Sequence, residues 1–181
     1  MPVRRISVVG NSGAGKTTFA RTLATQLGVP HVELDSFFHQ PNWTPSPLDV
    51  FRDQVTAALA GDGWVVDGNY SVLRDLIWDR ADTVVWLDLP RPVVMRQVIA
   101  RTLRRMATRE TLWNGNRERW RNIVCLDPDK SIIMWAWNQH EKYRERYAAA
   151  SVEPAYRHLT FVRLTSRKEM QRFAADLCSC R

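Results

Sequence analysis

The amino-acid sequence predicts an α/β fold with a parallel β-sheet, and three observations lead to this expectation. Short apolar runs alternate with segments that have the spacing of amphipathic helices. A glycine-rich turn joins the first apolar run, residues 6–9, to the first helical segment. Acidic residues, Asp35 and Asp67, follow the next two runs. Such alternation builds βαβ units with right-handed crossovers, and ligands of these sheets bind at the carboxyl ends of the strands.

The glycine-rich turn has a composition that is specific for binding phosphate groups. It reads Gly10-Asn11-Ser12-Gly13-Ala14-Gly15-Lys16-Thr17, with Thr18 next, and fits the P-loop pattern G-x-x-x-x-G-K-[ST] between a strand and a helix. The backbone N–H groups of residues 10–18 are expected to bind ATP, helped by the positive end of the helix dipole. Lys16 is expected to reach the β- and γ-phosphates, and the Thr17 hydroxyl to bind Mg²⁺. A chance glycine turn is the alternative.

The size and composition favour one globular domain over residues 1–181. Hydrophobic residues make up 45% and charged residues 25% of the 181 residues, which is ordinary for such a domain. No apolar run approaches the roughly 20 residues of a membrane span, so we expect no membrane partner and a cytoplasmic location. The net charge of +7 favours a polyanionic partner, either a nucleotide or a nucleic acid. Three cysteines, Cys125, Cys178 and Cys180, read as incidental thiols, with terminal metal binding as the alternative.

The first half of the chain gives three strands and three helices in order. A helix over residues 15–27 has an apolar face of Phe19, Leu23 and Leu27, and Gly28 ends it. Residues 31–34 form a strand that ends at Asp35. The prolines of residues 36–47 indicate a loop, after which a capping box at residues 46–49 opens a helix that ends near Gly61. Residues 64–66 form the third strand, and a short helix over residues 73–77 follows.

The second half continues the same alternation. Residues 83–89 form a buried strand that Pro90 ends, and a helix begins near Pro92 and runs into an arginine-rich region. A long helix is expected over residues 131–150, a last strand over residues 159–164 and a closing helix over residues 169–177. Trp64 and Trp86 fall within predicted strands and are expected in the core.

Three acidic residues are placed to act beside the P-loop. Glu33 and Asp35 lie two apart and would share one face of a strand, and Asp67 ends the next strand. One carboxylate could help to hold Mg²⁺, and another could take a proton from an acceptor hydroxyl. The alternatives are a helix cap or turn for Asp35, a turn with Gly68 for Asp67, and an exposed or salt-bridged side chain for Glu33.

The arginine-rich region is expected to form a lid over about residues 101–122. Arg101 and Arg105 are spaced i,i+4, so they share a helix face and could neutralise a triphosphate. Residues 114–116 are expected to turn within this mobile lid. A solvated basic surface is the alternative. Aromatic residues in the loops and the lid could stack on a substrate ring, although ordinary packing is the simpler reading: Trp43, Trp113 and Trp120.

These stretches together resemble the adenylate-kinase-like branch of P-loop kinases, and within it the small bacterial proteins called topology modulation proteins or adenylate-kinase-related kinases. The resemblance rests on residues 8–18, on residues 34–38 with 41–43, on residues 63–70 and on the arginine-rich lid. It implies a three-layer fold with helices on both faces of a five-stranded parallel sheet in the order 2-3-1-4-5. It also implies Mg-ATP as phosphoryl donor, a substrate-binding carboxylate at Asp35 and a magnesium-orienting one at Asp67.

One departure from the family bears on the acceptor. Adenylate kinases follow the Asp-Gly pair with Phe-Pro-Arg, whose arginine holds a monophosphate, whereas this chain has Asn69, Tyr70 and Ser71. We therefore expect Asp67, Gly68, Asn69 and Tyr70 to contact a hydroxylated acceptor rather than AMP.

Two functions follow from these features. The favoured one is a small-molecule or nucleotide kinase that moves the γ-phosphoryl group of Mg-ATP to a hydroxyl or phosphate acceptor. In it, Lys16, Arg101 and Arg105 stabilise the transferring group, Asp35 activates the acceptor, and Thr17 and Asp67 bind the metal. The alternative is a slow ATPase that acts as a nucleotide-dependent regulatory or DNA-binding protein, although no aromatic-interleaved nucleic-acid motif supports it.

Overall fold

The computed structural model describes residues 3–117 and 131–179, and it contains the expected parallel sheet. Its strands are β1 (Arg5–Gly10), β2 (His31–Glu33), β5 (Trp64–Asp67), β6 (Thr83–Leu87) and β7 (Thr160–Leu164). They pair in the order β2-β5-β1-β6-β7, and every pairing is parallel. This order is the expected 2-3-1-4-5, so the fold-class prediction is confirmed.

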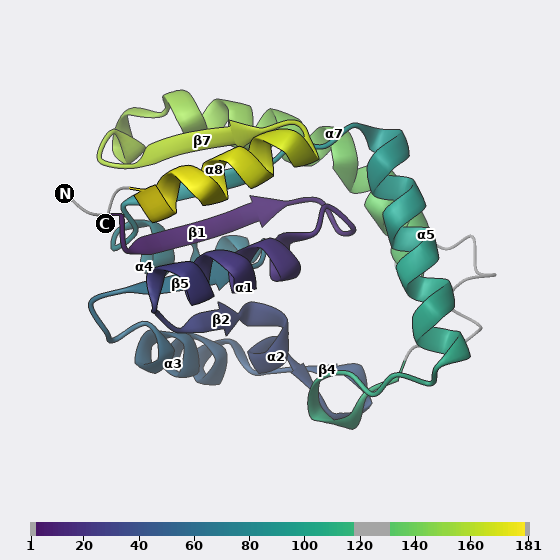
Figure 1. Cartoon of the computed structure of the whole chain (residues 1–181). Coiled ribbons are helices and arrows are strands. Elements are labelled where there is room, and N and C mark those ends of the chain that lie inside the picture. The colour runs from purple at the N-terminus through teal and green to yellow at the C-terminus, as the bar shows by residue number, and fades with distance from the viewer. Residues whose placement is uncertain (1–2, 118–130, 180–181) are drawn as a thin grey trace.

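Helices cover both faces of the sheet and make the fold three-layered (Figure 1). On one face, α1 (Lys16–Leu27) and α8 (Arg167–Ser179) pack on apolar residues of β1, β5 and β6. On the other face lie α3 (Leu48–Ala58), α4 (Arg74–Trp78) and α7 (Ile132–Val152). Trp64 and Trp86 belong to the core on this second face, as expected. Gly28 ends α1 at a φ of 66°, a conformation that glycine adopts without strain.

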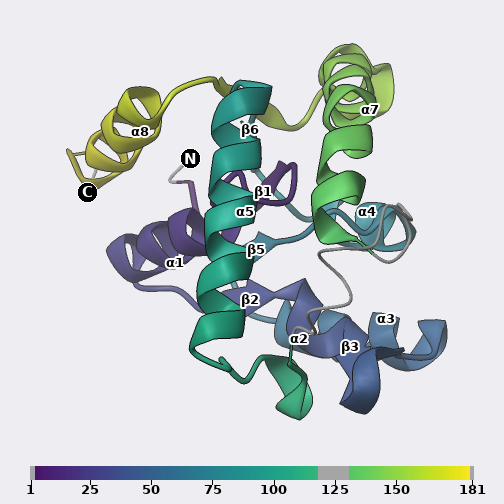
Figure 2. The ribbon, with the colours of Figure 1, turned by 90° about the vertical axis from the view of Figure 1, so that its right-hand side faces the viewer.

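The helix α5 (Arg91–Ala107) stands across the carboxyl ends of the strands, as Figure 2 shows. It lies so close to the P-loop that a Cβ on Gly13 would come within 2.9 Å of the Val94 carbonyl oxygen. Glycine is therefore required at this position by the approach of α5. The predicted lid thus begins as the last turns of α5 and continues into the turn η3 (Trp113–Gly115). Its residues 118–122 lie outside the described part of the chain.

The second strand ends earlier than predicted, and this changes the surroundings of Asp35. Leu34–Phe38 form a short helix, α2, so the expectation that Glu33 and Asp35 share a strand face is wrong. The ladder between β2 and β5 ends at the pair of Glu33 and Asp67, and Gly68 follows it with a φ of 147°. Leu34 then packs in the core against Gly68. A Cβ atom on Gly68 would come within 2.8 Å of Leu34 Cδ1.

The segment predicted as a loop over residues 36–47 contains ordered structure. A small hairpin pairs β3 (His39–Gln40) with β4 (Thr44–Pro45) around the turn η1 (Pro41–Trp43). The capping box predicted after it does not form, because α3 begins at Leu48 behind Pro47 and receives no side-chain cap bond. The ends of α3, at Ala58, and of β6, at Leu87, also fall earlier than predicted.

The remaining turns are short, and the described helices do not include a candidate membrane span. The turns η2 (Ser71–Leu73) and η4 (Pro154–Tyr156) precede α4 and β7. Among residues 3–117 and 131–179, no helix is both long enough and apolar enough to cross a lipid bilayer.

Candidate active site

An open pocket of about 820 Å³ lies where the P-loop, the carboxyl ends of the strands and α5 meet. The P-loop and the start of α1 line it with Ser12, Gly13, Gly15, Lys16, Thr17 and Thr18. The strand ends contribute Glu33, Asp35 and Asp67, and α5 contributes Arg101, Arg104 and Arg105. The structure therefore brings the predicted phosphate-binding, acidic and basic residues into one pocket.

The P-loop curls so that its backbone faces this pocket. Gly15 has a φ of 89°, and the place where a Cβ would stand is open for at least 4 Å. A side chain there would be strained and would project into the space left for phosphates. The first N–H groups of α1 have no acceptor within the helix, and they therefore point a positive dipole end at the pocket.

Asn11 fixes the loop from behind and does not line the pocket. Its Oδ1 accepts the Ser12 N–H at 2.8 Å, and its Nδ2 donates to the Ala136 carbonyl oxygen of α7 at 2.7 Å. Ala14 donates its N–H to the Asn11 carbonyl oxygen at 3.1 Å. The side chain of Asn11 is buried, so this predicted ATP-binding residue acts through the shape of the loop.

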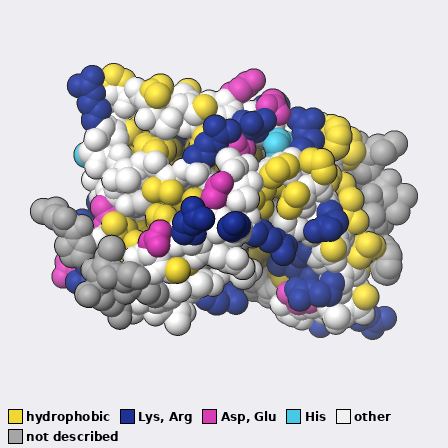
Figure 3. Space-filling view, turned by 45° about the horizontal axis from the view of Figure 1, so that its top comes forward, with side chains coloured by type: hydrophobic (Ala, Val, Ile, Leu, Met, Phe, Trp, Pro, Cys, Tyr) yellow, Lys and Arg dark blue, Asp and Glu magenta, His cyan; other side chains and the backbone are white. Residues whose placement is uncertain are grey.

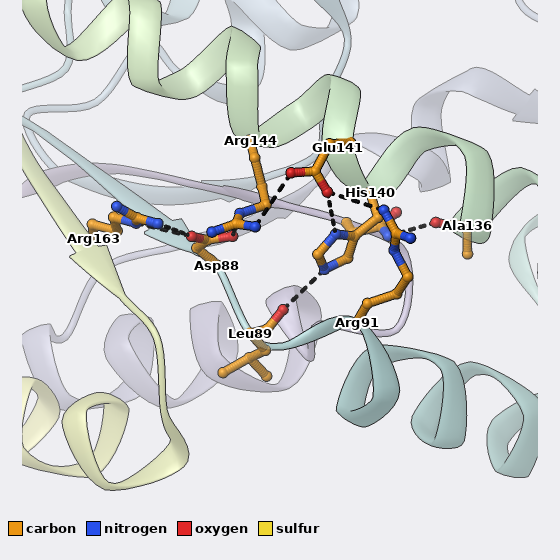
Figure 4. A network of polar contacts seen from close by, with 9 residues as sticks. Asp88, Leu89, Arg91, Ala136, His140, Glu141, Arg144 and Arg163 are labelled. Atoms are coloured by element: carbon orange, nitrogen blue, oxygen red, sulfur yellow. Dashed lines mark hydrogen bonds and ion pairs between the residues drawn. The ribbon is translucent and has the colours of Figure 1, made fainter.

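A polar network holds α7 against the end of β6, next to the attachment of Asn11 (Figure 4). The His140 ring lies 3.1 Å from the Leu89 carbonyl oxygen, and buried Asp88 accepts the Nε hydrogen of Arg163 at 2.9 Å. Arg144 contacts both Asp88 and Glu141. On the face of the molecule that Figure 3 shows, basic side chains lie beside acidic ones and a histidine. The network ties α7 to the strand that leads into α5.

Lys16 lies inside the loop, with its Nζ 3.1 Å from the Asn11 carbonyl oxygen. Desolvation lowers the pKa of Lys16, and the charge of Arg101 lowers it further. The carboxylates of Asp67, Asp35 and Glu33 oppose this shift. The ammonium group is therefore influenced by both acidic and basic neighbours, and a bound phosphate would add a negative charge that favours its protonated form.

The side chains of Thr17, Asp67 and Glu33 form a set of oxygen ligands. The Thr17 hydroxyl donates to Asp67 Oδ2 at 2.8 Å and lies 3.3 Å from Glu33 Oε1. Burial raises the pKa of Glu33, and the neighbouring charge of Asp67 raises it further. A hydroxyl and two crowded carboxylates suit Mg²⁺, which prefers oxygen ligands and keeps places for phosphates and water. These residues therefore fit the metal that the P-loop motif implies.

His31, which the sequence analysis passed over, supports this set from the neighbouring strand. Its Nε2 lies 2.8 Å from Asp67 Oδ1, while Asp67 Oδ2 receives the Thr17 hydroxyl. Both oxygens of the buried Asp67 carboxylate are therefore oriented by protein groups. The position of a histidine at the start of a predicted edge strand gave no sign of this contact.

Asp35 faces the pocket from α2 and is oriented by Tyr70. The Tyr70 hydroxyl donates to Asp35 Oδ1 at 2.7 Å. Burial and the nearby charge of Asp35 raise the pKa of Tyr70, so the phenol keeps its proton. Phe38 and Phe51 pack against the Tyr70 ring at centroid distances of 4.8 and 5.0 Å. Tyr70 thus lies behind Asp35 and outside the pocket lining.

Asn69 and Gly68 also lie outside the pocket lining. Asn69 Nδ2 donates to the Gly10 carbonyl oxygen at 2.7 Å, and its Oδ1 accepts the Gly10 N–H at 3.2 Å. The same Oδ1 accepts the hydroxyl of buried Tyr147 at 2.9 Å. Gly68 packs against Leu34 in the core. The amide of Asn69 therefore joins the start of the P-loop to α7.

The arginines of α5 reach the P-loop side of the pocket. Arg101 Nη2 donates to the Ser12 hydroxyl at 3.1 Å, and Arg104 and Arg105 form ion pairs with Glu110. The pocket also contains Arg21, which sequence reasoning did not select. Because Arg21 follows Thr17 by one helical turn, its i,i+4 spacing could have identified it.

Some residues that the sequence singled out lie outside the described residues: Arg119, Trp120, Arg121, Cys125 and Cys180. The side chain of Cys178 is likewise not described.

Known kinases are similar to this chain in sequence and in fold. No protein-family model matches the chain. A shikimate kinase from Synechococcus elongatus is 28% identical over 134 residues, which covers 62% of this chain and 70% of that protein. A second shikimate kinase, from Synechococcus sp., matches with the same identity and coverage.

Solved structures show the same fold. A shikimate kinase from Bacteroides thetaiotaomicron superposes with a TM-score of 0.58 at 16% identity, over 98% of each chain. One from Acinetobacter baumannii, in complex with shikimate, gives 0.56 at 18% identity over 98% of this chain and 92% of the other. A gluconokinase from Sinorhizobium meliloti gives 0.51 at 18% identity over 99% and 95%. The chain therefore shares the fold of these solved kinases, and part of its sequence is similar to that of two shikimate kinases.

Proposed function

We propose that this protein is an ATP-dependent kinase that transfers the γ-phosphoryl group of Mg-ATP to a hydroxyl group of a small molecule. The observation that carries the proposal is that Lys16, the pair of Thr17 and Asp67, and Asp35 all line one pocket. The distant relationship to shikimate kinases supports the same reaction class.

The P-loop end of the pocket is suited to the donor. The backbone around Gly15 binds the phosphate chain, and Lys16 and Arg101 balance the charge of the γ-phosphoryl group. Thr17 and Asp67, with Glu33 beside them, would hold Mg²⁺. When bound, Mg²⁺ supplies charge neutralisation on the phosphate oxygens.

A second pocket of about 430 Å³ adjoins this end and has a mainly apolar lining. It is bounded by residues of the P-loop, α1 and α8, among them Thr18, Arg167 and Met170. A flat, partly apolar purine fits such a lining, so we assign the adenine of ATP to this pocket.

Asp35 is suited to the acceptor. With Oδ1 held by Tyr70, the carboxylate takes the proton of the acceptor hydroxyl. The acceptor oxygen forms a bond to the γ-phosphorus while the bond to the β–γ bridging oxygen breaks, so that ADP leaves. This assignment gives Tyr70 the role of a positioning residue. Asn69 is not assigned a contact with the acceptor, because its side chain holds the backbone of Gly10.

Within residues 3–117 and 131–179, no specific contact favours the alternative of a slow regulatory ATPase that binds DNA. Four arginines, including Arg101 and Arg105, line the pocket itself and are accounted for by a triphosphate. On the face that Figure 3 shows, basic side chains adjoin acidic and apolar ones. The narrower resemblance to topology modulation proteins, a phosphate acceptor and a cytoplasmic location stay predictions.

A screen for acceptor-dependent ADP release tests the proposal. The purified protein with Mg-ATP is expected to release ADP faster in the presence of at least one hydroxylated small molecule, with mass spectrometry showing the phosphorylated product. Asp35→Asn should lose this release while it still binds ATP, whereas Asp53→Asn, on the exposed side of α3, should not. ATP hydrolysis that no small molecule accelerates would contradict a kinase.

A further inference from the structure

We propose that the acceptor is a neutral, polyhydroxylated saturated ring of the sugar or cyclitol class, held against an aromatic corner formed by His39, Trp43 and Trp113. The inference rests on the proposed kinase function and concerns the end of the pocket next to Asp35. All three rings line the pocket together with that carboxylate.

The three rings meet at defined angles. The His39 and Trp113 rings stack with centroids 5.7 Å apart and planes inclined by 23°. Trp43 stands nearly perpendicular to Trp113, with centroids 6.4 Å apart at 83°. The two indoles thus form two walls of a corner. Trp113 also lies near Glu33 and opposes the rise in the pKa of that carboxyl group, so one wall reaches the proposed metal ligands.

The corner is built from two segments that are far apart in sequence and are joined by asparagines. Asn114 Nδ2 donates to the His39 carbonyl oxygen at 2.7 Å. Asn116 donates through Nδ2 to the Gln40 carbonyl oxygen at 2.9 Å, and it accepts the Trp43 N–H at 2.9 Å. Asn116 is buried. These bonds fix the hairpin and η3 against each other around the pocket.

The backbone at the corner is held in an unfavourable conformation. Trp43 has a φ of 60°, as does Asn42, and Asn114 has a φ of 53°. Bulky side chains rarely adopt a left-handed backbone, and such strain is typical of binding sites. Ordinary core packing does not require an indole there, because Trp43 is only partly buried. The strain and the asparagine bonds together aim Trp43 at the pocket.

The shape and charge of the corner select the class of acceptor. A nucleobase binds best between parallel aromatic planes, whereas perpendicular indoles suit the C–H faces of a puckered ring. The carboxylate of Asp35, at this end of the pocket, repels an anionic acceptor. Burial lowers the pKa of His39, which favours the uncharged form of the ring stacked on Trp113. Arg52, on the helix that follows the hairpin, pairs with Asp75 and does not line the pocket.

Matched acceptors test this inference with the purified protein. The neutral probes are D-glucose, D-galactose, D-mannose and myo-inositol, the acidic probes are D-glucuronate, D-gluconate and shikimate, and the base-bearing probes are adenosine and uridine. At least one neutral probe should be phosphorylated, with kcat/KM at least about tenfold above every acidic or base-bearing probe. Preference for an acid or a nucleoside overturns the inference and leaves the kinase proposal intact. Phosphorylation of none of the probes overturns the inference, whereas the kinase proposal is overturned only if no small molecule in the wider screen accelerates ADP release.

Tryptophan variants test the contact itself. Trp43→Leu and Trp113→Leu should each raise KM for the preferred neutral probe about tenfold, while KM for ATP changes less than about twofold. Trp137→Leu, an exposed tryptophan of α7 outside the pocket, is the control. Equal KM values in all three variants contradict the aromatic corner. If a variant does not fold, the comparison of neutral with acidic probes on the wild-type protein still decides the question.

Discussion

The Thr17 hydroxyl lies 2.8 Å from Asp67 Oδ2, although 50 residues separate them in the sequence. The contact joins the first turn of α1 to the carboxyl end of β5, at the point where Mg²⁺ would bind between them. His31 orients the other Asp67 oxygen from β2. Three neighbouring elements of the fold therefore converge on one carboxylate.

Asp67→Asn should weaken the use of Mg²⁺ more than the binding of the nucleotide. The amide keeps the shape of the carboxylate but loses its charge, so the Mg²⁺ concentration needed for half-maximal turnover should rise at least about tenfold. Titration of Mg²⁺ at saturating ATP measures this. The substitution Asp53→Asn, at an exposed position, is the matched control. If Asp67→Asn leaves the Mg²⁺ requirement unchanged, Asp67 is not a ligand of the metal.

Tyr70→Phe should lower kcat with little change in KM for ATP. It removes the hydrogen bond to Asp35 Oδ1 and leaves the ring packed on Phe38 and Phe51. A loosely held base is expected to slow turnover about threefold to thirtyfold. Steady-state kinetics with the acceptor that the proposed screen identifies give the result. A kcat equal to that of the wild type would show that Asp35 needs no support from Tyr70.

Asn69→Ala should destabilise the protein and weaken ATP binding together. The substitution leaves the Gly10 N–H and C=O and the Tyr147 hydroxyl without their partner. Partly buried polar groups that lose their hydrogen bonds cost about 1–3 kcal/mol of the free energy of unfolding. Denaturant unfolding and ATP titration measure the two effects. Asn138→Ala, an exposed position on α7, should change neither, and similar behaviour of the two variants would contradict the anchoring role.

Asp75→Asn should remove a contribution to stability that depends on pH. Hydrogen bonds from Arg52, and then from the backbone, hold the pKa of Asp75 at about 2. Because this lies below the unfolded value of about 4, the ionised carboxylate stabilises the folded protein above pH 4. That stabilisation is lost as the pH falls through about 2.

Unfolding at a series of pH values tests this pair. The difference in the free energy of unfolding between wild type and Asp75→Asn should be present at pH 7 and shrink between about pH 4 and pH 2. The exposed Asp79→Asn, at the end of the same helix, should show no such change. A difference that stays constant down to pH 2 would contradict the role of the ion pair.

Much of this structure follows from local signals in the sequence. The periodicities of residues 15–27 and 83–89 and the P-loop motif locate α1, β6 and the phosphate site within a few residues. The spacing of Arg101 and Arg105 places both on the side of α5 that lines the pocket. These features depend on neighbours within one or two turns, which a single sequence records.

The features that the sequence did not reveal depend on distant partners. Leu34 enters a helix and packs against Gly68, so the position of Asp35 depends on contacts with the end of another strand. The hairpin around Trp43 is ordered by Asn116, which lies 73 residues further along the chain. Asn69 contacts Gly10 and Tyr147 instead of facing the pocket, because the end of β5 lies beside the P-loop. Local sequence patterns do not predict such contacts between residues that are far apart in the sequence.

The central claim is that the P-loop binds the triphosphate of Mg-ATP through Lys16, and isothermal titration calorimetry tests it most directly. The wild type and Lys142→Ala, a lysine on the exposed side of α7, should each bind Mg-ATP at one site. Lys16→Ala should bind at least about tenfold more weakly, because the buried end of the triphosphate loses its cation. Absence of binding heat in the wild type, or the same Kd for Lys16→Ala as for the wild type, would contradict the account.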